Sequence, residues 1–277
     1  MLFEVRKIQK QLTIFSYYLL IHDRMKKIES RHQRLIKIIE VFPESRLHWI
    51  EKVIDILNCP QRITFHKQKL MKEDWAISFG DALMIHHAFS NEPFTKDKFE
   101  HAFVNTAKLV GIMADFAPRG NKGHDVIIGP TKYSLKTQAD RSIKEDFIWI
   151  SKYMELGKGE WADKPEQLKT LLSSFLNHLK ESDKILILRC LKKAPNWKYE
   201  LVEIPKALLE RSEFGELKMM GNSTQMPKPG YCSVMGENNA LDFQLYFDGG
   251  TERKLQVKSL RKSLCNIIGE WEFDPNP

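Results

Sequence analysis

Cysteine is scarce in this sequence, and no two cysteines are spaced as metal ligands usually are. The chain has four of them, Cys59, Cys190, Cys232 and Cys265. None forms a C-x-x-C pair, which argues against a zinc ribbon. Isolated cysteines are typical of reduced thiols, so we expect a cytoplasmic protein.

Long hydrophobic runs, internal repeats and low-complexity tracts are also lacking. The most apolar stretch near the N-terminus, residues 12–21, follows three basic residues and faintly resembles a signal peptide. It contains two tyrosines and a serine, and no small-residue cleavage site follows it. Because it is also far too short to span a bilayer, we expect a helix there and no membrane-spanning segment.

Basic residues, by contrast, are in excess. The 43 lysines and arginines outnumber the 36 aspartates and glutamates, which gives a formal net charge of +7. A basic surplus favours polyanionic partners such as nucleic acid, an anionic membrane or an acidic protein. The 277 residues, 42% of them hydrophobic, are enough to bury a core in one large domain or two small ones.

Hydrophobic periodicity divides the chain into a helical part and a mixed part. Residues 1–94 are predicted to be a helical N-terminal region, and residues 95–277 a core with a β-rich C-terminal part, the two forming one compact unit. The expected helices cover 3–21, 30–41, 44–57, 76–89, 95–113, 141–156 and 164–181. The expected strands cover 126–128, 133–138, 184–191, 198–204, 243–247, 254–260 and 267–273. Residues 221–239 are expected to be a flexible or functional loop.

One predicted hairpin carries the residues of most chemical interest. Asp125 begins its first strand, Gly129–Lys132 is the expected turn, and Ser134 and Lys136 lie two apart on the second strand, so both point to the same face. A hard divalent ion takes oxygen ligands, which the Asp125 carboxylate and the Leu135 carbonyl offer. A lysine beside them can orient or deprotonate an attacking water. The cluster predicts Mg²⁺-dependent phosphodiester hydrolysis.

Each of these residues also has an ordinary explanation. An aspartate at a strand start is commonly a turn or cap residue, and a strand lysine is commonly an exposed edge charge. Ser134 and Lys136 could also act as nucleophile and base, but their spacing differs from the Ser-x-x-Lys pattern that places such a pair on one helical face. Their grouping on one hairpin of a basic chain favours the nuclease interpretation.

The order of residues and elements resembles the PD-(D/E)xK nuclease superfamily, which includes most type II restriction endonucleases. The match is His124-Asp125 followed by Ser134-Leu135-Lys136. The resemblance implies an α+β fold, with a mixed central β-sheet flanked by helices in a restriction-endonuclease-like core. It also implies that Asp125, Ser134 and Lys136 are catalytic, and that the substrate is double-stranded DNA.

The sequence departs from the superfamily pattern at two positions. His124 stands where proline is common, and Ser134 stands where an acid normally supplies a metal ligand. The same Ser-x-Lys form occurs in restriction enzymes that cut sites with a CCGG core, and this likeness implies a replacement acid from the following helix. Glu145 and Asp146 are the candidates there, and the expected helix phase favours Asp146. Glu100, on the upstream helix, is a further candidate ligand.

Residues around the hairpin are candidates for DNA contacts. The basic, glycine-rich loop 119–124 is predicted to meet the DNA backbone. The candidates in and after this loop are Arg119, Asn121, Lys122, His124, Gln138, Asp140 and Arg141. The last two lie where the similar restriction enzymes place base-reading groups. One predicted strand either contacts DNA phosphates or is an ordinary solvent-exposed face. Its basic residues are Arg253, Lys254, Lys258, Arg261 and Lys262.

We therefore expect a type II restriction endonuclease that hydrolyses both DNA strands at a short site. Cutting at a symmetric site generally needs two active sites, so we expect a homodimer. One alternative is a superfamily nuclease with a role in repair, nicking or transposon-end cleavage. The other is a non-catalytic DNA-binding protein with a decayed site, which the serine at position 134 makes conceivable.

Overall fold

The structure is a computed structural model, and it describes residues 26, 28–66, 70–118, 120–140, 143–157 and 161–275. The predicted helix 3–21 and two predicted DNA-contact residues, Arg119 and Arg141, lie outside the described residues. Within the described ranges, no helix is long and apolar enough to cross a membrane.

The chain divides into two compact units, the first ending at Asp55 and the second beginning at Ile56. The described part of the first unit contains a helix over 28–39 and most of α2 (Glu44–Asn58), close to the predicted helices 30–41 and 44–57. Glu44 lies in the first turn of α2, where the positive end of the helix dipole favours an acid.

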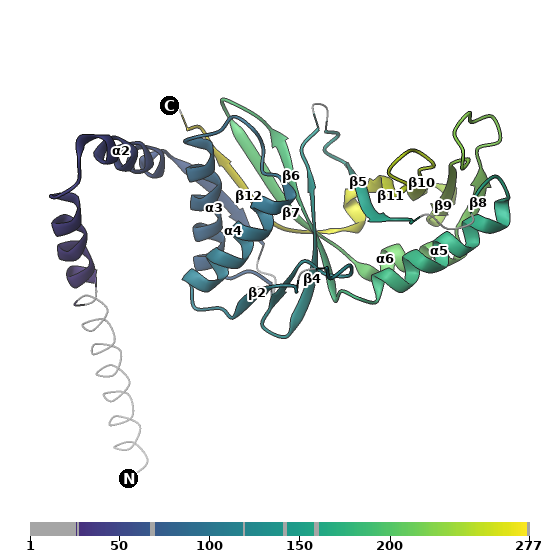
Figure 1. The fold of residues 1–277 in the computed structure, drawn as a ribbon, viewed down its shortest axis with the longest axis horizontal. Helices are drawn as coiled ribbons and strands as arrows, with labels where there is room; N and C mark the ends of the chain where they lie inside the picture. The colour runs from purple at the N-terminus through teal and green to yellow at the C-terminus, as the bar shows by residue number, and fades with distance from the viewer. Residues whose placement is uncertain are drawn as a thin grey trace, which may run out of the picture. The chain divides into compact units, whose positions relative to one another are not determined.

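A mixed β-sheet forms the centre of the second unit (Figure 1). In the described residues it has seven strands, in the order β1-β12-β7-β6-β4-β3-β2. The bounds are β1 (Gln61–Phe65), β2 (Ala114–Phe116), β3 (Val126–Ile128), β4 (Thr131–Gln138), β6 (Lys184–Lys192), β7 (Trp197–Ile204) and β12 (Asn266–Phe273). The pair β4–β6 is parallel and the other neighbouring pairs are antiparallel.

At strand β6, both faces of the sheet are buried. Ile185 and Ile187 pack into one hydrophobic cluster, whereas Leu186 and Leu188 pack into another on the opposite face. β6 covers the predicted strand 184–191, and its apolar residues reach both clusters because successive side chains of a strand alternate between the two faces.

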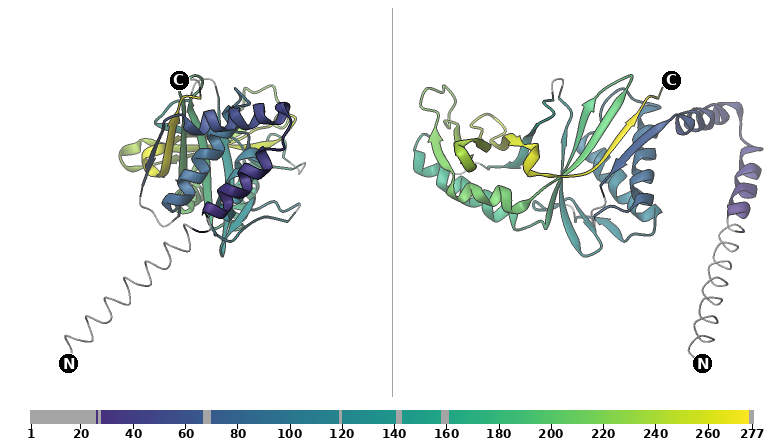
Figure 2. Two further views of the ribbon diagram at one scale, coloured as in Figure 1. Left: turned by 90° about the vertical axis from the view of Figure 1, so that its left-hand side faces the viewer. Right: turned by 180° about the vertical axis from the view of Figure 1, so that it is seen from behind.

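Helices cover both sides, which confirms the predicted α+β class. Figures 1 and 2 show α3 (Glu73–His87) and α4 (Lys96–Leu109) on one face of the sheet. Phe99 and Phe103 lie one turn apart on α4 and are fully buried against Phe79 of α3. Phe79 in turn packs against Trp271 of β12. α5 (Pro165–Leu179) and α6 (Lys206–Glu210) contribute to the hydrophobic cluster on the opposite face.

A second, antiparallel sheet shares that opposite cluster. Its order is β5-β11-β10-β9-β8. The bounds are β5 (Phe147–Glu155), β8 (Glu216–Met219), β9 (Gly230–Met235), β10 (Leu241–Phe247) and β11 (Lys254–Arg261), with short 3-10 turns η1 (Arg211–Phe214), η2 (Glu237–Asn239) and η3 (Lys262–Leu264). The predicted strands 243–247 and 254–260 are confirmed as β10 and β11, which pair as an antiparallel hairpin.

The predicted helix over 141–156 is wrong, because this segment contains strand β5. Its side chains alternate, with Ile148 and Ile150 buried and Phe147 and Trp149 exposed. Two exposed aromatic residues conceal this alternation in the sequence, since they are as apolar as the buried ones. Pairing with β11, about a hundred residues further along the chain, makes the segment a strand.

Further strands lie where the sequence predicted none, β1, β8 and β9 among them. β1 falls inside the expected helical region 1–94, and it pairs with β12 near the other end of the chain. β9 falls inside the expected loop 221–239 and pairs with β8 and β10. The turn of the β3–β4 hairpin is also tighter than expected, because Ile128 pairs with Thr131 and only Gly129 and Pro130 connect them. Gly129 takes a φ of 57°, as the first position of such a turn requires.

Candidate active site

The β3–β4 hairpin holds the carboxylate of Asp125 in a fixed place. The Asp125 N–H donates to the Tyr133 carbonyl at 2.8 Å, so the residue continues the strand ladder. The Leu135 N–H donates to Asp125 Oδ2 at 2.6 Å. One carboxylate oxygen is thus bound to β4, and Oδ1 is directed elsewhere.

Helix α4 brings a cation and a second carboxylate to Asp125. Lys96 Nζ lies 2.6 Å from Asp125 Oδ1 and 3.1 Å from Glu100 Oε1. Lys96 and Glu100 are one helical turn apart, so they share a face of α4. Burial raises the pKa of Glu100, and the ammonium of Lys96 opposes this effect. Sequence reasoning named Glu100 but missed Lys96, although the i,i+4 spacing of the two residues at a helix start was a usable signal.

Lys136 lies on the same hairpin with its charge buried. Its side chain is 7% exposed, and Nζ donates to Ser134 Oγ at 2.9 Å, which confirms that the two residues share a face. Nζ also lies 5.0 Å from the ring centre of Tyr153. Burial lowers the pKa of Lys136 to about 8, against the opposing charge of Asp125. A lysine in this range can exchange protons near neutral pH.

Two aromatic side chains complete the surroundings of Lys136, and sequence reasoning missed both. Tyr153 comes from β5, within the segment predicted as a helix, and His178 comes from α5; their rings lie 5.9 Å apart. Burial raises the pKa of Tyr153. Burial lowers the pKa of His178, and the charge of Lys136 lowers it further. Lys136 therefore lies between the central sheet and the β5–α5 layer, largely out of water.

The two acids expected from a following helix lie in a different cluster. Glu145 and Asp146 form a turn before β5. The buried Arg189 donates to the carbonyl of Glu145 at 3.1 Å, and Lys262 Nζ lies 3.8 Å from Glu145 Oε1. The N–H of Lys262 donates to the carbonyl of Asp146 at 2.9 Å. Since the described residues 143–155 form a turn and strand β5 and not a helix, the helix phase that favoured Asp146 does not exist.

The loop before Asp125 has both a structural and an exposed part. Asn121 Oδ1 accepts hydrogen bonds from the N–H groups of Gly123 and His124, at 2.8 and 3.2 Å, and so shapes the loop. The side chain of Lys122 is exposed. His124 is buried, and neither ring nitrogen has a hydrogen-bond partner among the described residues.

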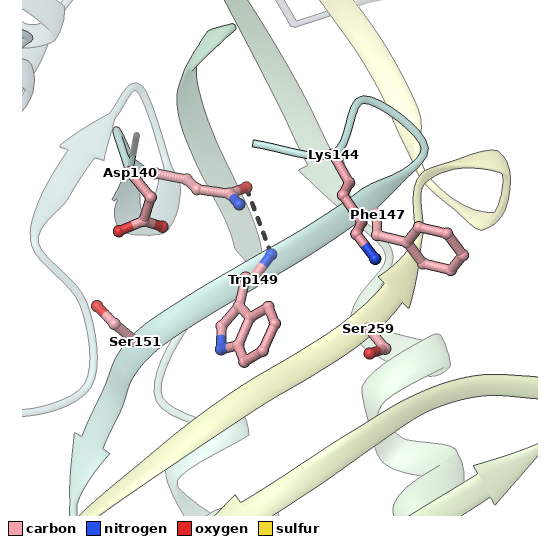
Figure 3. A pocket seen from close by; sticks show the side chains of 7 residues that line it. Asp140, Lys144, Phe147, Trp149, Ser151 and Ser259 are labelled. Atoms are coloured by element: carbon pink, nitrogen blue, oxygen red, sulfur yellow. Dashed lines mark hydrogen bonds between the residues drawn. The ribbon is translucent and has the colours of Figure 1, made fainter. Parts of the chain in front are cut away.

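A pocket of about 580 Å³ opens beyond the end of β4 (Figure 3). Asp140, Lys144, Trp149 and Ser151 line it, together with Gln138. Gln138 is buried, and its Oε1 accepts from the N–H of Trp149 at 3.3 Å, so this predicted DNA contact also links β4 to β5. Asp140 is exposed at the rim, where a ligand has access to it.

The donor set beside Lys96 fits a divalent cation of the magnesium type. The described residues contain no cluster of three or more His, Cys, Asp and Glu side chains. Magnesium usually takes only one or two carboxylates and keeps several waters. Asp125 and Glu100 offer two carboxylates, and the ammonium of Lys96 between them shows that a cation is stable at this position.

The chain also matches a known protein family. The model of the SmaI family, described as type II site-specific deoxyribonuclease, matches residues 47–273. The chain belongs to this family. It is 44% identical over 206 residues to the type II restriction enzyme SmaI of Serratia marcescens, an alignment that covers 74% of this chain and 81% of that enzyme. No solved structure matches the chain.

Family membership confirms the predicted function. This restriction endonuclease is a site-specific deoxyribonuclease, a phosphodiester hydrolase whose substrate is double-stranded DNA. Type II restriction enzymes generally use divalent metal ions, in agreement with the carboxylates beside Lys96. Membership favours restriction over the repair, nicking and transposon-end alternatives.

Proposed function

We propose that this restriction endonuclease cuts both DNA strands in a Mg²⁺-dependent reaction at Asp125, Ser134 and Lys136. The site is a serine variant of the PD-(D/E)xK type. One observation carries the proposal: Asp125 Oδ1 already holds a cation at 2.6 Å, while Oδ2 is fixed to Leu135, beside the buried Lys136.

Three oxygens of the chain would hold the metal. Asp125 and Glu100 supply carboxylates, and Leu135 supplies its backbone carbonyl. In a strand the N–H and C=O of one residue point to the same side. Because the Leu135 N–H points at Asp125, its carbonyl lies on that side too. Mg²⁺ bound there would polarise the phosphoryl group and lower the pKa of a coordinated water.

Lys136 would act on the attacking water. Its ammonium is fixed by Ser134 Oγ, so its remaining hydrogens can orient a water or offset negative charge on the phosphate. The pKa near 8 leaves a fraction of neutral amine that can take the proton of the water. Attack in line with the scissile bond would then form one P–O bond and break the P–O bond to the leaving oxygen, which would take a proton from a second water and leave as a hydroxyl.

DNA binding is assigned to both sides of this cluster. Asn121 and Lys122, which are exposed, precede it on the chain and would face the DNA backbone, whereas the buried His124 would support their loop. Gln138 and Asp140 follow it and border the pocket of Figure 3, where a carboxylate can accept from the amino group of cytosine. Two copies of the chain would place two such sites on a symmetric DNA sequence.

The test is cleavage of DNA of known sequence by the purified chain, with and without Mg²⁺, followed by mapping of the ends. Wild-type protein should make double-strand cuts at one short recurring sequence, and only with the metal. Asp125→Asn should lower the cleavage rate at least about a hundredfold while leaving DNA binding intact. A bound metal ion stabilises the transition state by several kcal/mol, and this stabilisation is lost with its ligand.

The matched control is Asp115→Asn, which removes the same charge from the exposed Asp115 of β2, where it pairs with Lys108. This variant should cut at the wild-type rate. If Asp125→Asn cleaves normally, Asp125 is not a metal ligand. If Asp125→Asn is unfolded, Asp125 has a structural role as a cap.

A further inference from the structure

The ammonium of Lys96 is placed between the two carboxylates that the proposed function assigns to the metal. It lies 2.6 Å from Asp125 Oδ1 and 3.1 Å from Glu100 Oε1. The lysine side chain is 43% exposed, whereas the side chains of Asp125 and Glu100 are 18% and 19% exposed. A half-exposed cation thus covers two nearly buried acids.

We propose that Lys96 is a built-in competitor of the divalent cation, and that metal binds only by displacing its ammonium. The inference rests on the proposed function, in which Asp125 and Glu100 are metal ligands. It assigns a role to a residue outside the Asp125–Lys136 motif.

The hydrogen bonds of Asp125 make the competition direct. Asp125 Oδ2 accepts from the Leu135 N–H at 2.6 Å, so Oδ1 is the oxygen left for a cation. That oxygen is the one that Lys96 holds. An ammonium hydrogen and a metal ion need the same lone pairs, so both cannot occupy this position together.

The position of Lys96 on α4 is unusual for a structural ion pair. Lys96 is the first residue of the helix, where the helix dipole favours acids over lysine. Its presence there is explained by the two carboxylates in front of it. A phosphate of bound DNA would offer the displaced ammonium another anionic partner.

Divalent-cation affinity in the absence of DNA tests the proposal. Mn²⁺ is titrated into the full-length protein, and free Mn²⁺ is measured by electron paramagnetic resonance. Lys96→Met should bind Mn²⁺ about tenfold more tightly than wild type, because one charge-assisted hydrogen bond no longer has to be broken. Lys96→Arg keeps a cation in place and should show no such gain.

Two controls locate the effect. Lys98→Met removes the same charge from an exposed residue of the same helix and should leave the affinity unchanged. Adding Asp125→Asn to Lys96→Met should abolish the gain. Circular dichroism checks that each variant is folded, and Lys96→Arg remains informative if the methionine variant is not.

Each outcome decides the matter. The competitor role is overturned if folded Lys96→Met binds Mn²⁺ no more tightly than wild type. It is also overturned if the gain in Mn²⁺ affinity persists when Asp125→Asn is added. If only Lys96→Arg folds, tighter Mn²⁺ binding by that variant overturns it. In those cases the metal site still stands if Asp125→Asn abolishes cleavage. If Asp125→Asn cleaves normally, the proposed function fails and the competitor role with it.

Discussion

At the scale of single residues, the site contains a lysine whose charge is costly to bury. Lys136 is 7% exposed, and burial lowers its pKa from 10.5 to about 8. Each unit of a pKa shift corresponds to about 1.4 kcal/mol, so the protonated lysine opposes folding by up to about 3 kcal/mol at neutral pH. A residue retained at this cost has a function that an apolar residue could not supply.

Lys136→Met should therefore lose cleavage and gain stability. We expect a rate at least about a hundredfold lower, since an amine that acts in the chemical step is gone. DNA affinity should be preserved. The unfolding free energy at pH 7, measured with denaturant in the presence of a chelator, should rise by about 1 to 3 kcal/mol. The control is Lys132→Met, at an exposed position of the same strand, which should change neither quantity.

The gain in stability should depend on pH in a defined direction. The pKa of Lys136 is lower in the folded state than in the unfolded state, so between about pH 8 and 10.5 the unfolded chain binds more protons. The contribution of Lys136 to wild-type stability therefore rises with pH across this window, and the advantage of Lys136→Met shrinks. A constant difference between the two proteins from pH 7 to pH 10.5 would contradict the burial of a charged lysine.

The grouping of Asp125, Ser134 and Lys136 could be predicted from the sequence because it is local. A short hairpin pairs neighbouring segments, and the alternation of side chains then places two of them on one face. Lys96 and Tyr153 could not be predicted in this way. They reach the hairpin from α4 and β5, whose positions depend on packing between distant parts of the chain.

At the scale of elements, a buried ion pair holds the connection between β4 and β5. Arg189 and Glu200 are fully buried and lie 2.7 Å apart across β6 and β7. Arg189 also donates to the carbonyls of Lys144, Glu145 and Phe147. This pair fixes the start of β5 and therefore helps to place Tyr153 against Lys136.

Glu200→Gln should destabilise the protein by about 3 to 5 kcal/mol, the effect of leaving one charge of a buried pair without its partner. Thermal unfolding measures this loss. Glu203→Gln is the control on the same strand, since Glu203 pairs with Lys184 in a more exposed position and should contribute less than about 1 kcal/mol. Equal losses in the two variants would show that the Arg189–Glu200 pair has no special role.

Elements with strong periodicity could be predicted, and those that depend on distant partners could not. β6 has apolar residues on both faces, and α5 has a regular apolar stripe, so each was recognised. The sequence predicts a helix in place of β5 because Phe147, Ile150 and Met154 fit helical spacing. β1 was missed because its partner, β12, lies near the other end of the chain.

At the scale of the whole molecule, the basic surplus matches the DNA substrate. The formal charge of +7 favours association with a polyanion but gives no information about the cut site. A symmetric double-strand cut needs two copies of the Asp125–Lys136 site, so the working form should be a homodimer.

Sedimentation equilibrium at working concentration should therefore give a mass twice that of the 32.4 kDa chain. On a supercoiled plasmid with one site, linear DNA should form without accumulation of nicked circles, because both strands are cut in one encounter. A monomeric protein that accumulates nicked circles would contradict the homodimer and would support a nicking nuclease instead.

The central claim is that Asp125 and Lys136 act together on one phosphodiester bond. The most direct measurement is the single-turnover cleavage rate of the DNA-bound enzyme for wild type, Asp125→Asn, Lys136→Met and the double variant. Groups that act as a unit give losses that do not add. We predict that the double variant cuts about as slowly as the slower single variant. The account would be contradicted if the fold-decrease in rate of the double variant were the product of the two single decreases. It would also be contradicted if either single variant kept more than about a tenth of the wild-type rate.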